Sequence, residues 1–449
     1  MPVSPARRAA FDILMRVEEE EAYASELLHS PKFDKLSSED RGLTHEIVMG
    51  VLRWRSRLDQ EIGLHSFTPL RKLDAAVLTA LRMGAYQLRH LDRIPKHSAV
   101  DESVELVKSS GKASAAGLAN AVLRKIASAK SVPKPATMAD EFAHPAWLVE
   151  RWSERFGLET AHNICEFDQQ RPVTHIRIRA GNDVNGILTS LKAEGVSLRA
   201  GEILDSCWQV AEGDVTRTSA WKYRRVSIQD EGSQLVAHLA AVCVQEPQRI
   251  LDCCAAPGGK TMLLAEKHAQ AKVIAAELHP HRVETLKKLC NAPNVEVMQA
   301  DATRFAFPDE DKFDLVLADV PCSGTGTLGR NPEIKWRLKP EKLVELNELQ
   351  FAIAENALAQ AKPGGVLVYS TCSLEVEENE AVVERLLTAE QCELVPLVEV
   401  RDRVPLQRQL RDDVASILSG SYLRTIPGRQ SCDGFFAAVL RKTGLRSRF

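Results

Sequence analysis

Two cysteines follow apolar runs of this sequence, and each lies in a short polar loop where a thiol could react. Cys322 is in "ADVPCSGTG", and Cys372 is in "YSTCSLEVEENE". Free cysteines are most often buried and inert, but a deprotonated thiol at the end of a strand can also be a nucleophile. Residue types alone leave open whether either cysteine attacks a substrate, and which one.

Three acidic residues follow apolar runs of the same region. Glu277 ends "KVIAAE", Asp301 ends "VEVMQAD" and Asp319 ends "FDLVLAD". Each of them alone is typical of a turn or a helix cap. Together they suit a ligand that carries a ribose, an amino group and a positive centre. S-adenosylmethionine has all three, so the pattern predicts this cofactor.

A glycine pair precedes the first of these acids, in "LDCCAAPGGKTMLLAEK". Gly258 and Gly259 would let the backbone approach a ligand at a helix N-terminus. A nucleotide phosphate loop would need glycine at position 254, where Cys254 stands, and the dinucleotide pattern G-x-G-x-x-G is absent. Both nucleotide interpretations therefore fail.

A thiolate beside a methyl donor favours one reaction. Carbon 5 of cytosine is a poor nucleophile until a thiolate adds at carbon 6. Methyl transfer, loss of the carbon 5 proton and elimination of the thiol would follow. Asp319 is placed to stabilise the adduct as an acid at ring N3.

The elements that must hold these residues alternate between strand and helix from residue 248 onward. Five short apolar runs, such as "RILDCCA" and "GGVLVYST", are separated by mostly helical stretches. This alternation predicts a Rossmann-like α/β domain with a parallel sheet covered on both faces. Since ligands bind at the carboxyl ends of such strands, the two thiols and the acids would share one edge.

Two further domains are predicted before this one. Residues 5–130 have helical periodicity throughout, and "ASAKSVPKPATMADE" is typical of a linker. We expect an all-α domain over 1–135, a small α+β module over 140–230 and the α/β domain over 231–449. In the module, basic and aromatic side chains could form an RNA surface or protect a strand edge: Arg177, Arg179, Lys222, Tyr223, Arg224 and Arg225.

Composition restricts the class of protein. The chain has 449 residues, 44% hydrophobic and 27% charged, with a net charge of −3, which fits a globular protein without a broadly basic coat. Only residues 1–135 are net basic, weak support for a polyanionic partner there. Ten cysteines without any C-x-x-C pair disfavour a disulfide scaffold or a zinc site. No secretory or membrane-spanning run occurs, so we expect a cytoplasmic protein without a membrane partner.

Longer motifs add a resemblance. "RIPKHSAVDESVELVK" with "GLANAVLRKI" resembles the NusB-type RNA-binding fold. "DCCAAPGGKT", "DVPCSGTGTLGRNPEIKWR" and "YSTCSLEVEENE" resemble the signatures of RNA 5-methylcytosine methyltransferases. The combination resembles the bacterial 16S rRNA (cytosine-C5) methyltransferases of the Sun/Fmu type. Two positions depart from that pattern: Val320 stands where alanine is commoner, and Arg179 where asparagine is expected.

The resemblance implies roles for individual residues. Cys372 would be the nucleophile, and Cys322 would assist product release. S-adenosylmethionine would contact Glu277, Asp301, Asp319 and a continuous segment of the glycine loop: Cys254, Ala255, Ala256, Pro257, Gly258, Gly259 and Lys260. The implied substrate is a single-stranded loop cytosine of 16S rRNA, and we expect a monomer. Two alternatives remain, the same chemistry on tRNA and a non-enzymatic NusB-like RNA adaptor.

Overall fold

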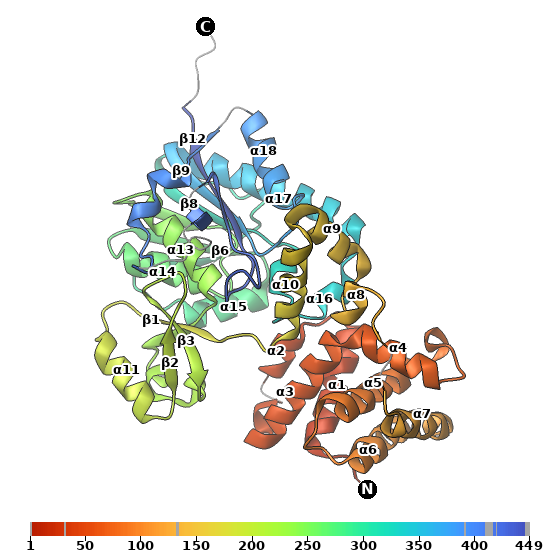
Figure 1. The fold of residues 1–449 in the computed structure, drawn as a ribbon. Coiled ribbons are helices and arrows are strands. Elements are labelled where there is room, and N and C mark those ends of the chain that lie inside the picture. The colour runs from red at the N-terminus through yellow and green to blue at the C-terminus, as the bar shows by residue number, and fades with distance from the viewer. Residues whose placement is uncertain are drawn as a thin grey trace. The chain divides into compact units, whose positions relative to one another are not determined.

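The structure is a computed structural model that describes residues 2–30, 33–131, 134–389, 392–408, 416–418 and 420–444. The chain forms two compact units, and neither follows one continuous stretch of sequence (Figure 1). The first contains residues 1–171 and 328–337, and the second contains 172–327 and 338–449. The boundaries 1–135, 140–230 and 231–449 stay a prediction. No helix of the described ranges has the length and apolar character to cross a membrane.

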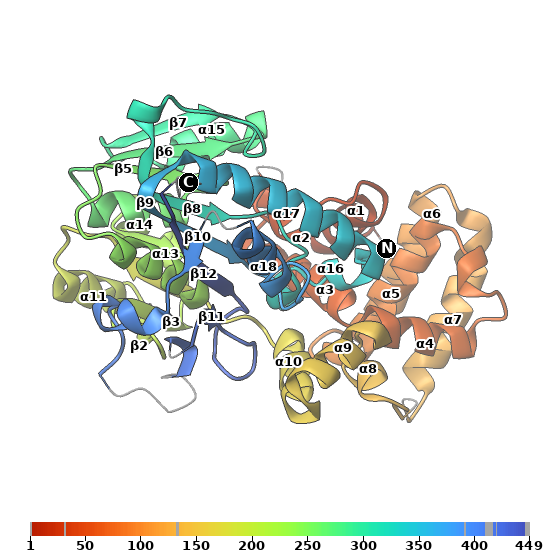
Figure 2. The ribbon, with the colours of Figure 1, turned by 90° about the horizontal axis from the view of Figure 1, so that it is seen from above.

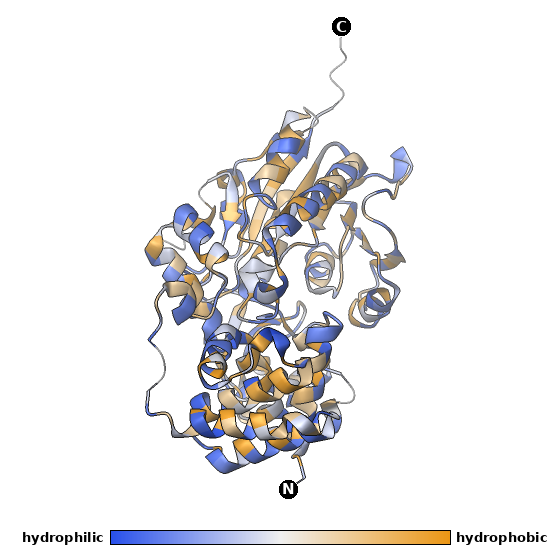
Figure 3. Ribbon diagram, turned by 90° about the vertical axis from the view of Figure 1, so that its right-hand side faces the viewer, coloured by the Kyte–Doolittle hydropathy of each residue, from blue (hydrophilic) through white to orange (hydrophobic). Residues whose placement is uncertain are grey.

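The first unit is helical, as predicted. Figure 3 shows hydrophobic and hydrophilic bands alternating along its helices, and the hydrophobic side chains Leu81, Met83, Leu106 and Leu123 are fully buried. Its α-helices are α1 Pro5–Glu19, α2 Ala24–Leu28, α3 Ser38–Arg53, α4 Arg55–His65, α5 Ala75–His90, α6 Lys96–Ser109, α7 Ala116–Ser128, α8 Met138–Glu141, α9 Ala146–Phe156, α10 Leu158–Gln169 and α16 Ile334–Arg337; 3-10 turns cover Phe33–Lys35, Leu70–Lys72 and Ala113–Ala115.

Helix α16 belongs to this unit although it lies far along the chain. The Trp336 indole donates to the Leu52 carbonyl at 2.6 Å, and Arg337 donates to the Ala22 carbonyl at 2.8 Å. The carboxylate of Glu333 accepts from the backbone N–H of Ala24 at 2.9 Å. The second half of the motif "DVPCSGTGTLGRNPEIKWR" is therefore part of the helical unit, which the sequence did not predict.

The second unit contains a small antiparallel sheet in the order β2-β3-β1-β4. Its core is built from Ile176, Ile187, Leu191 and Val226, which confirms a small α+β module. The elements are β1 His175–Ile178, α11 Val184–Ala193, β2 Ser197–Ala200, β3 Cys207–Glu212, the 3-10 turn Val215–Arg217, α12 Ser219–Lys222 and β4 Val226–Ile228.

The larger sheet of the second unit has the order β10-β12-β9-β8-β5-β6-β7, with β11 paired to β12. The five predicted strands are parallel, whereas β10, β11 and β12 pair antiparallel and were not predicted. The strands are β5 Arg249–Asp252, β6 Lys272–Glu277, β7 Val295–Gln299, β8 Phe313–Asp319, β9 Ala361–Thr371, β10 Cys392–Leu394, β11 Tyr422–Arg424 and β12 Phe436–Lys442.

Helices cover both faces of this sheet, as predicted. Figure 2 shows α13 and α14 on one side and α17 on the other, and two separate cores result. The helices are α13 Glu231–Cys243, α14 Gly259–Lys267, α15 Pro280–Leu289, α17 Pro340–Gln360 and α18 Glu380–Thr388, with 3-10 turns at Asp309–Asp311, Thr325–Thr327, Leu397–Glu399, Arg401–Arg403 and Ser416–Leu418.

The chain order reverses beside β5. The chain runs outward from β5 to β6 and β7, then returns to place β8 and β9 on the other side of β5. In open sheets of this kind, ligands bind at the carboxyl ends of the strands where the order reverses. We therefore expect the loops after β5 and β8 to form a ligand site.

Candidate active site

The two candidate thiols lie next to each other. Cys322 follows β8 and Cys372 follows β9, and these strands are parallel neighbours. The Sγ atoms are 3.2 Å apart. The hydrogen bond with Cys372 and burial raise the pKa of the Cys322 thiol well above its ordinary value. Cys322 is therefore held as a neutral thiol in the resting site.

A buried carboxylate joins the two cysteine loops. Glu378 is fully buried and accepts from the Ser323 N–H at 2.7 Å, from the hydroxyls of Ser323 and Ser373, and from the Gln350 amide at 2.9 Å. Burial raises the pKa of Glu378, although these hydrogen bonds oppose the shift. Glu378 was not among the residues predicted from the sequence, where the acidic run "EVEENE" beside Cys372 was the available signal.

A close backbone approach brings the same loops together. The Gly326 N–H donates to the Cys372 carbonyl at 2.9 Å, and the Gly434 N–H donates to the Gly326 carbonyl at 2.7 Å. A Cβ on Gly326 would lie 2.2 Å from the Gly434 carbonyl oxygen. Only glycine fits at position 326. The segment before β12 therefore contacts the two cysteine loops at the carboxyl ends of β8 and β9, which we call the catalytic edge.

Asp319 forms an ion pair with Lys260. The Lys260 Nζ lies 2.7 Å from one carboxylate oxygen of Asp319, and the Ser370 hydroxyl donates to the other at 2.8 Å. Burial alone would lower the pKa of Lys260, but the charge and hydrogen bond of Asp319, together with the charges of Cys372 and Asp252, outweigh it and the net shift is upward. The Asp319 carboxylate is therefore held by two donors, one of which is a cation.

The glycine loop turns tightly between β5 and α14. Gly258 has φ +110°, and a Cβ there would lie 2.4 Å from the Cys290 sulfur. Behind the loop, the Thr261 hydroxyl donates to the buried Asp252 at 2.7 Å. Burial raises the pKa of Asp252 to about 7, with the charge of Asp319 acting in the same direction.

The other two acids at strand ends, Glu277 and Asp301, differ in their surroundings. Together with Asp319 they are called the rim acids below. Glu277 ends β6, is 4% exposed, and accepts from the His279 N–H at 3.0 Å. Asp301 lies two residues beyond β7 and accepts from the Thr303 N–H and hydroxyl, at 3.0 and 2.7 Å. These bonds lower the pKa of Asp301 and form a local turn, the ordinary role of a single acid at this place. Glu277 is the better placed acceptor for a ribose diol.

The six basic and aromatic residues singled out in the small module fall into two groups, one buried or half-buried and one exposed. Arg177 is 5% exposed and therefore does not lie on a surface, contrary to expectation. Arg177 and Arg179 both pair with Glu266 of α14, at 2.5 and 2.8 Å. Lys222, Tyr223, Arg224 and Arg225 are exposed. The first pair stabilises the small sheet against α14, and only the second group is accessible to RNA.

The residues of this edge fit S-adenosylmethionine by their chemistry. Gly258 lets the loop after β5 close against Cys290 in a tight turn at the N-terminus of α14, and buried Glu277 offers carboxylate oxygens at the end of the next strand. The fold and the site together define an α/β methyltransferase.

Comparisons with known proteins identify the family. The family model described as "16S rRNA methyltransferase RsmB/F" matches residues 239–441, the NusB family matches 4–128, and the "Methyltr_RsmF/B-like, ferredoxin-like domain" matches 144–215. "Probable ribosomal RNA small subunit methyltransferase B" of Bacillus subtilis is 32% identical over 99% of this chain and 100% of its own length. "Ribosomal RNA small subunit methyltransferase B" of Salmonella arizonae is 32% identical, covering 92% and 93%. The chain belongs to the RsmB/F methyltransferase family.

Solved structures agree with the fold. The chain titled "Crystal Structure of PH0851" has a TM-score of 0.79 and 25% identity, and the match covers 98% of this chain and 100% of that one. NSun6 from Pyrococcus horikoshii, solved with SFG, has a TM-score of 0.55 and 19% identity, with coverage of 67% and 98%. The latter supports the fold alone.

Proposed function

We propose that this protein transfers a methyl group from S-adenosylmethionine to carbon 5 of a cytosine in 16S rRNA. The observation that carries the proposal is the pair of thiols 3.2 Å apart beside the Lys260–Asp319 ion pair. The relatives are named for methylation of small-subunit ribosomal RNA. A base that meets a thiol must leave its stack, so a single-stranded loop of the rRNA is the substrate we propose. The protein would act in the cytoplasm as a monomer.

Cys372 is the proposed nucleophile. Cys372 directly follows β9, its sulfur lies 3.2 Å from that of Cys322, and it interacts electrostatically with the Lys260 ammonium. In Cys322, by contrast, the hydrogen bond to Cys372 and burial favour the neutral thiol. The Cys372 thiolate would form a bond to carbon 6 of the cytosine.

The Lys260–Asp319 pair is the proposed partner of the base. Addition at carbon 6 moves electron density onto ring N3, which must then accept a proton or a strong hydrogen bond. Lys260 carries a proton at the site, and Asp319 fixes the ammonium group at 2.7 Å. The pair would supply the proton to N3 and recover it when the adduct breaks down.

S-adenosylmethionine would supply an electrophilic methyl group to carbon 5 and leave as S-adenosylhomocysteine. The carbon 5 proton would then pass to a base before the bond between Cys372 and carbon 6 breaks. We propose that the ribose of the cofactor is held by Glu277, with Asp301 and Asp319 on the same rim. Its amino acid part would lie against the glycine loop, which comprises Cys254, Ala255, Ala256, Pro257, Gly258, Gly259 and Lys260. Cys322 would assist the release of Cys372 from the methylated base, since the two sulfurs are in contact.

Bisulfite sequencing of 16S rRNA and tRNA tests this proposal. A strain that lacks the gene should lose 5-methylcytosine at one position of 16S rRNA, and a plasmid copy should restore it. Loss of the mark from tRNA would indicate the same chemistry on another substrate. An unchanged pattern in both RNAs would favour the NusB-like adaptor, which has no need of either thiol.

A further inference from the structure

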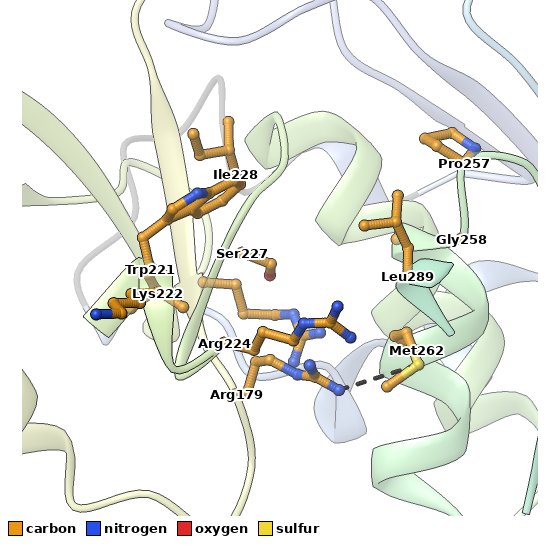
Figure 4. Close-up of a pocket in the computed structure, with 13 residues that line it drawn as sticks. Arg179, Trp221, Lys222, Arg224, Ser227, Ile228, Pro257, Gly258, Met262 and Leu289 are labelled. Carbon is orange, nitrogen blue, oxygen red and sulfur yellow. Dashed lines mark hydrogen bonds between the residues drawn. The ribbon is translucent and has the colours of Figure 1, made fainter. Parts of the chain in front are cut away.

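A pocket of about 410 Å³ lies between the small sheet and the methyltransferase domain. Figure 4 shows Trp221 and Ile228 on one wall and Met262 and Leu289 on the other, with the Arg224 guanidinium extending between them. The segment 257–259 of the glycine loop also lines it. Glu277, Asp301 and Asp319 do not line it, so the pocket shares the segment 257–259 with the proposed cofactor site and lies outside the rest of that site.

Large apolar side chains are exposed around this pocket. Trp221 is 38% exposed, Ile228 42% and Leu289 48%. Such residues gathered around one hollow are typical of a binding site. The accessible indole offers a flat face on which a base can stack, and the aliphatic groups can cover the edges of that base.

The charges of the pocket are all positive. Four lining residues are cations and none is a carboxylate. Glu266 balances Arg177 and Arg179. Lys222 and Arg224 are exposed, and neither is in an ion pair within the described ranges. Arg224 donates to the Lys288 carbonyl at 3.0 Å, which fixes its guanidinium at the rim. A phosphodiester group complements this arrangement.

We propose that the pocket binds one nucleotide of the substrate RNA that flanks the target cytosine. Its base stacks on Trp221 between Ile228 and Leu289, and its phosphate binds Lys222 and Arg224. Apolar stacking beside paired cations is how proteins hold single-stranded RNA without reading sequence. The glycine loop joins the pocket to the catalytic edge, so one strand of RNA can occupy both. This inference rests on the proposed function.

Substitutions of Trp221 test the stacking. Trp221→Ala should weaken binding of a short single-stranded 16S rRNA fragment, and raise its KM, about 5- to 100-fold. Trp221→Phe keeps an aromatic face and should retain most of the affinity. The Kd for S-adenosylmethionine and the thermal unfolding midpoint should stay unchanged in both variants, which separates lost stacking from misfolding.

Substitution of Lys222 tests the phosphate contact. Lys222→Ala should reduce the slope of log Kd for RNA against log salt concentration by about 0.7, the value for one phosphate of a single strand. Lys272→Ala is the matched control. Lys272 is the first residue of β6, so it lies at the amino ends of the parallel strands, away from the pocket, and it pairs with Glu296. The control should leave the slope unchanged.

Photo-crosslinking locates the nucleotide. RNA with 4-thiouridine one, two or three positions from the target cytosine should label the tryptic peptide 218–222, which contains Trp221, from one of these positions. No label on this peptide, together with an unchanged KM in Trp221→Ala, would overturn the inference. Stoichiometric binding of free AMP that Trp221→Ala abolishes, with KM for RNA unchanged, would also overturn it by indicating a mononucleotide site. In the same assay, failure of the unmodified enzyme to methylate any RNA would count against the proposed function itself.

Discussion

At the scale of single residues, the two cysteines are distinguished by their surroundings. Both follow neighbouring strands, and both sulfurs meet at 3.2 Å. The pKa of Lys260 is raised chiefly by Asp319, and Cys372 acts on that lysine in the same direction. The neutral Cys322 thiol and the cation beside Cys372 give the pair an asymmetry that the residue types lack.

Replacing Cys372 with alanine should abolish methylation. The proposed covalent step has no other thiolate to use, and the loss should exceed about 1000-fold, in the range seen when a nucleophile is removed. The Kd for S-adenosylmethionine, measured by calorimetry, should stay near normal because the rim acids are intact. Full activity in this variant would refute the assignment.

Replacing Cys322 with alanine should trap the reaction at a later stage. If Cys322 assists release, the bond between Cys372 and the RNA persists, and a slow protein–RNA band should accumulate on a denaturing gel. The double variant without either thiol is the control and should give no band. Trapping by the Cys372 variant instead would mean that the two roles are reversed.

At the scale of elements, Glu378 connects the loops after β8 and β9. Glu378→Ala would leave the buried Ser323 N–H without its acceptor, a cost of about 1–3 kcal/mol, and would leave the Gln350 amide with only the Pro321 carbonyl. Glu378→Gln keeps one acceptor oxygen and should be milder. We expect the single-turnover methylation rate to fall at least about tenfold in the alanine variant, since the two thiols lose their alignment.

The control for Glu378 is a second acid of the same motif. Glu377→Gln changes the same charge at the adjacent position, and we expect single-turnover rates close to those of the unmodified enzyme. Equal rates for Glu378→Ala and the unmodified enzyme would show that the carboxylate does not position the thiols.

Many of the helices and strands could be predicted from the sequence. The five parallel strands and the helical N-terminal region follow from local hydrophobic periods, which are properties of contiguous residues. The antiparallel β12 was missed because "FFAAVLRK" is a short apolar run whose pairing with β9 depends on residues far away in the chain. Segment 328–337 was missed for the same reason, since its partners Leu52 and Ala22 are distant in sequence.

At the scale of the whole molecule, residues 328–337, the second half of the motif that contains Cys322, belong to the helical unit. Lys335 of this segment is 1% exposed, and its Nζ makes no hydrogen bond within the described residues. Burial lowers the pKa of Lys335 to about 7, against the opposing charge of Asp168. The segment therefore carries a titratable group whose pKa differs between the folded and the unfolded chain.

This difference predicts a pH dependence of stability. The folded pKa lies below the unfolded value of 10.5, so the unfolded chain binds more protons between about pH 7 and 10.5, and this group makes stability rise with pH in that window. Lys335→Met should therefore stabilise the helical unit most below pH 7, and the gain should shrink toward pH 10. Denaturant unfolding of both proteins at pH 6, 8 and 10 measures this. A gain that is equal at all three values would contradict the shift.

The types of element, the glycine loop, and the acids and thiols at strand ends could be predicted, because they depend on residue type and local spacing. Three sets of contacts became visible only in the fold: the ion pair of Lys260 with Asp319, the link from Glu378 to both thiol loops, and the ion pairs of Arg177 and Arg179 with Glu266. These pairings join residues that are distant in sequence, and their energies arise from burial and from charges brought together by folding. The chemical groups can be read from the local sequence, whereas the partner of each group depends on contacts between distant segments.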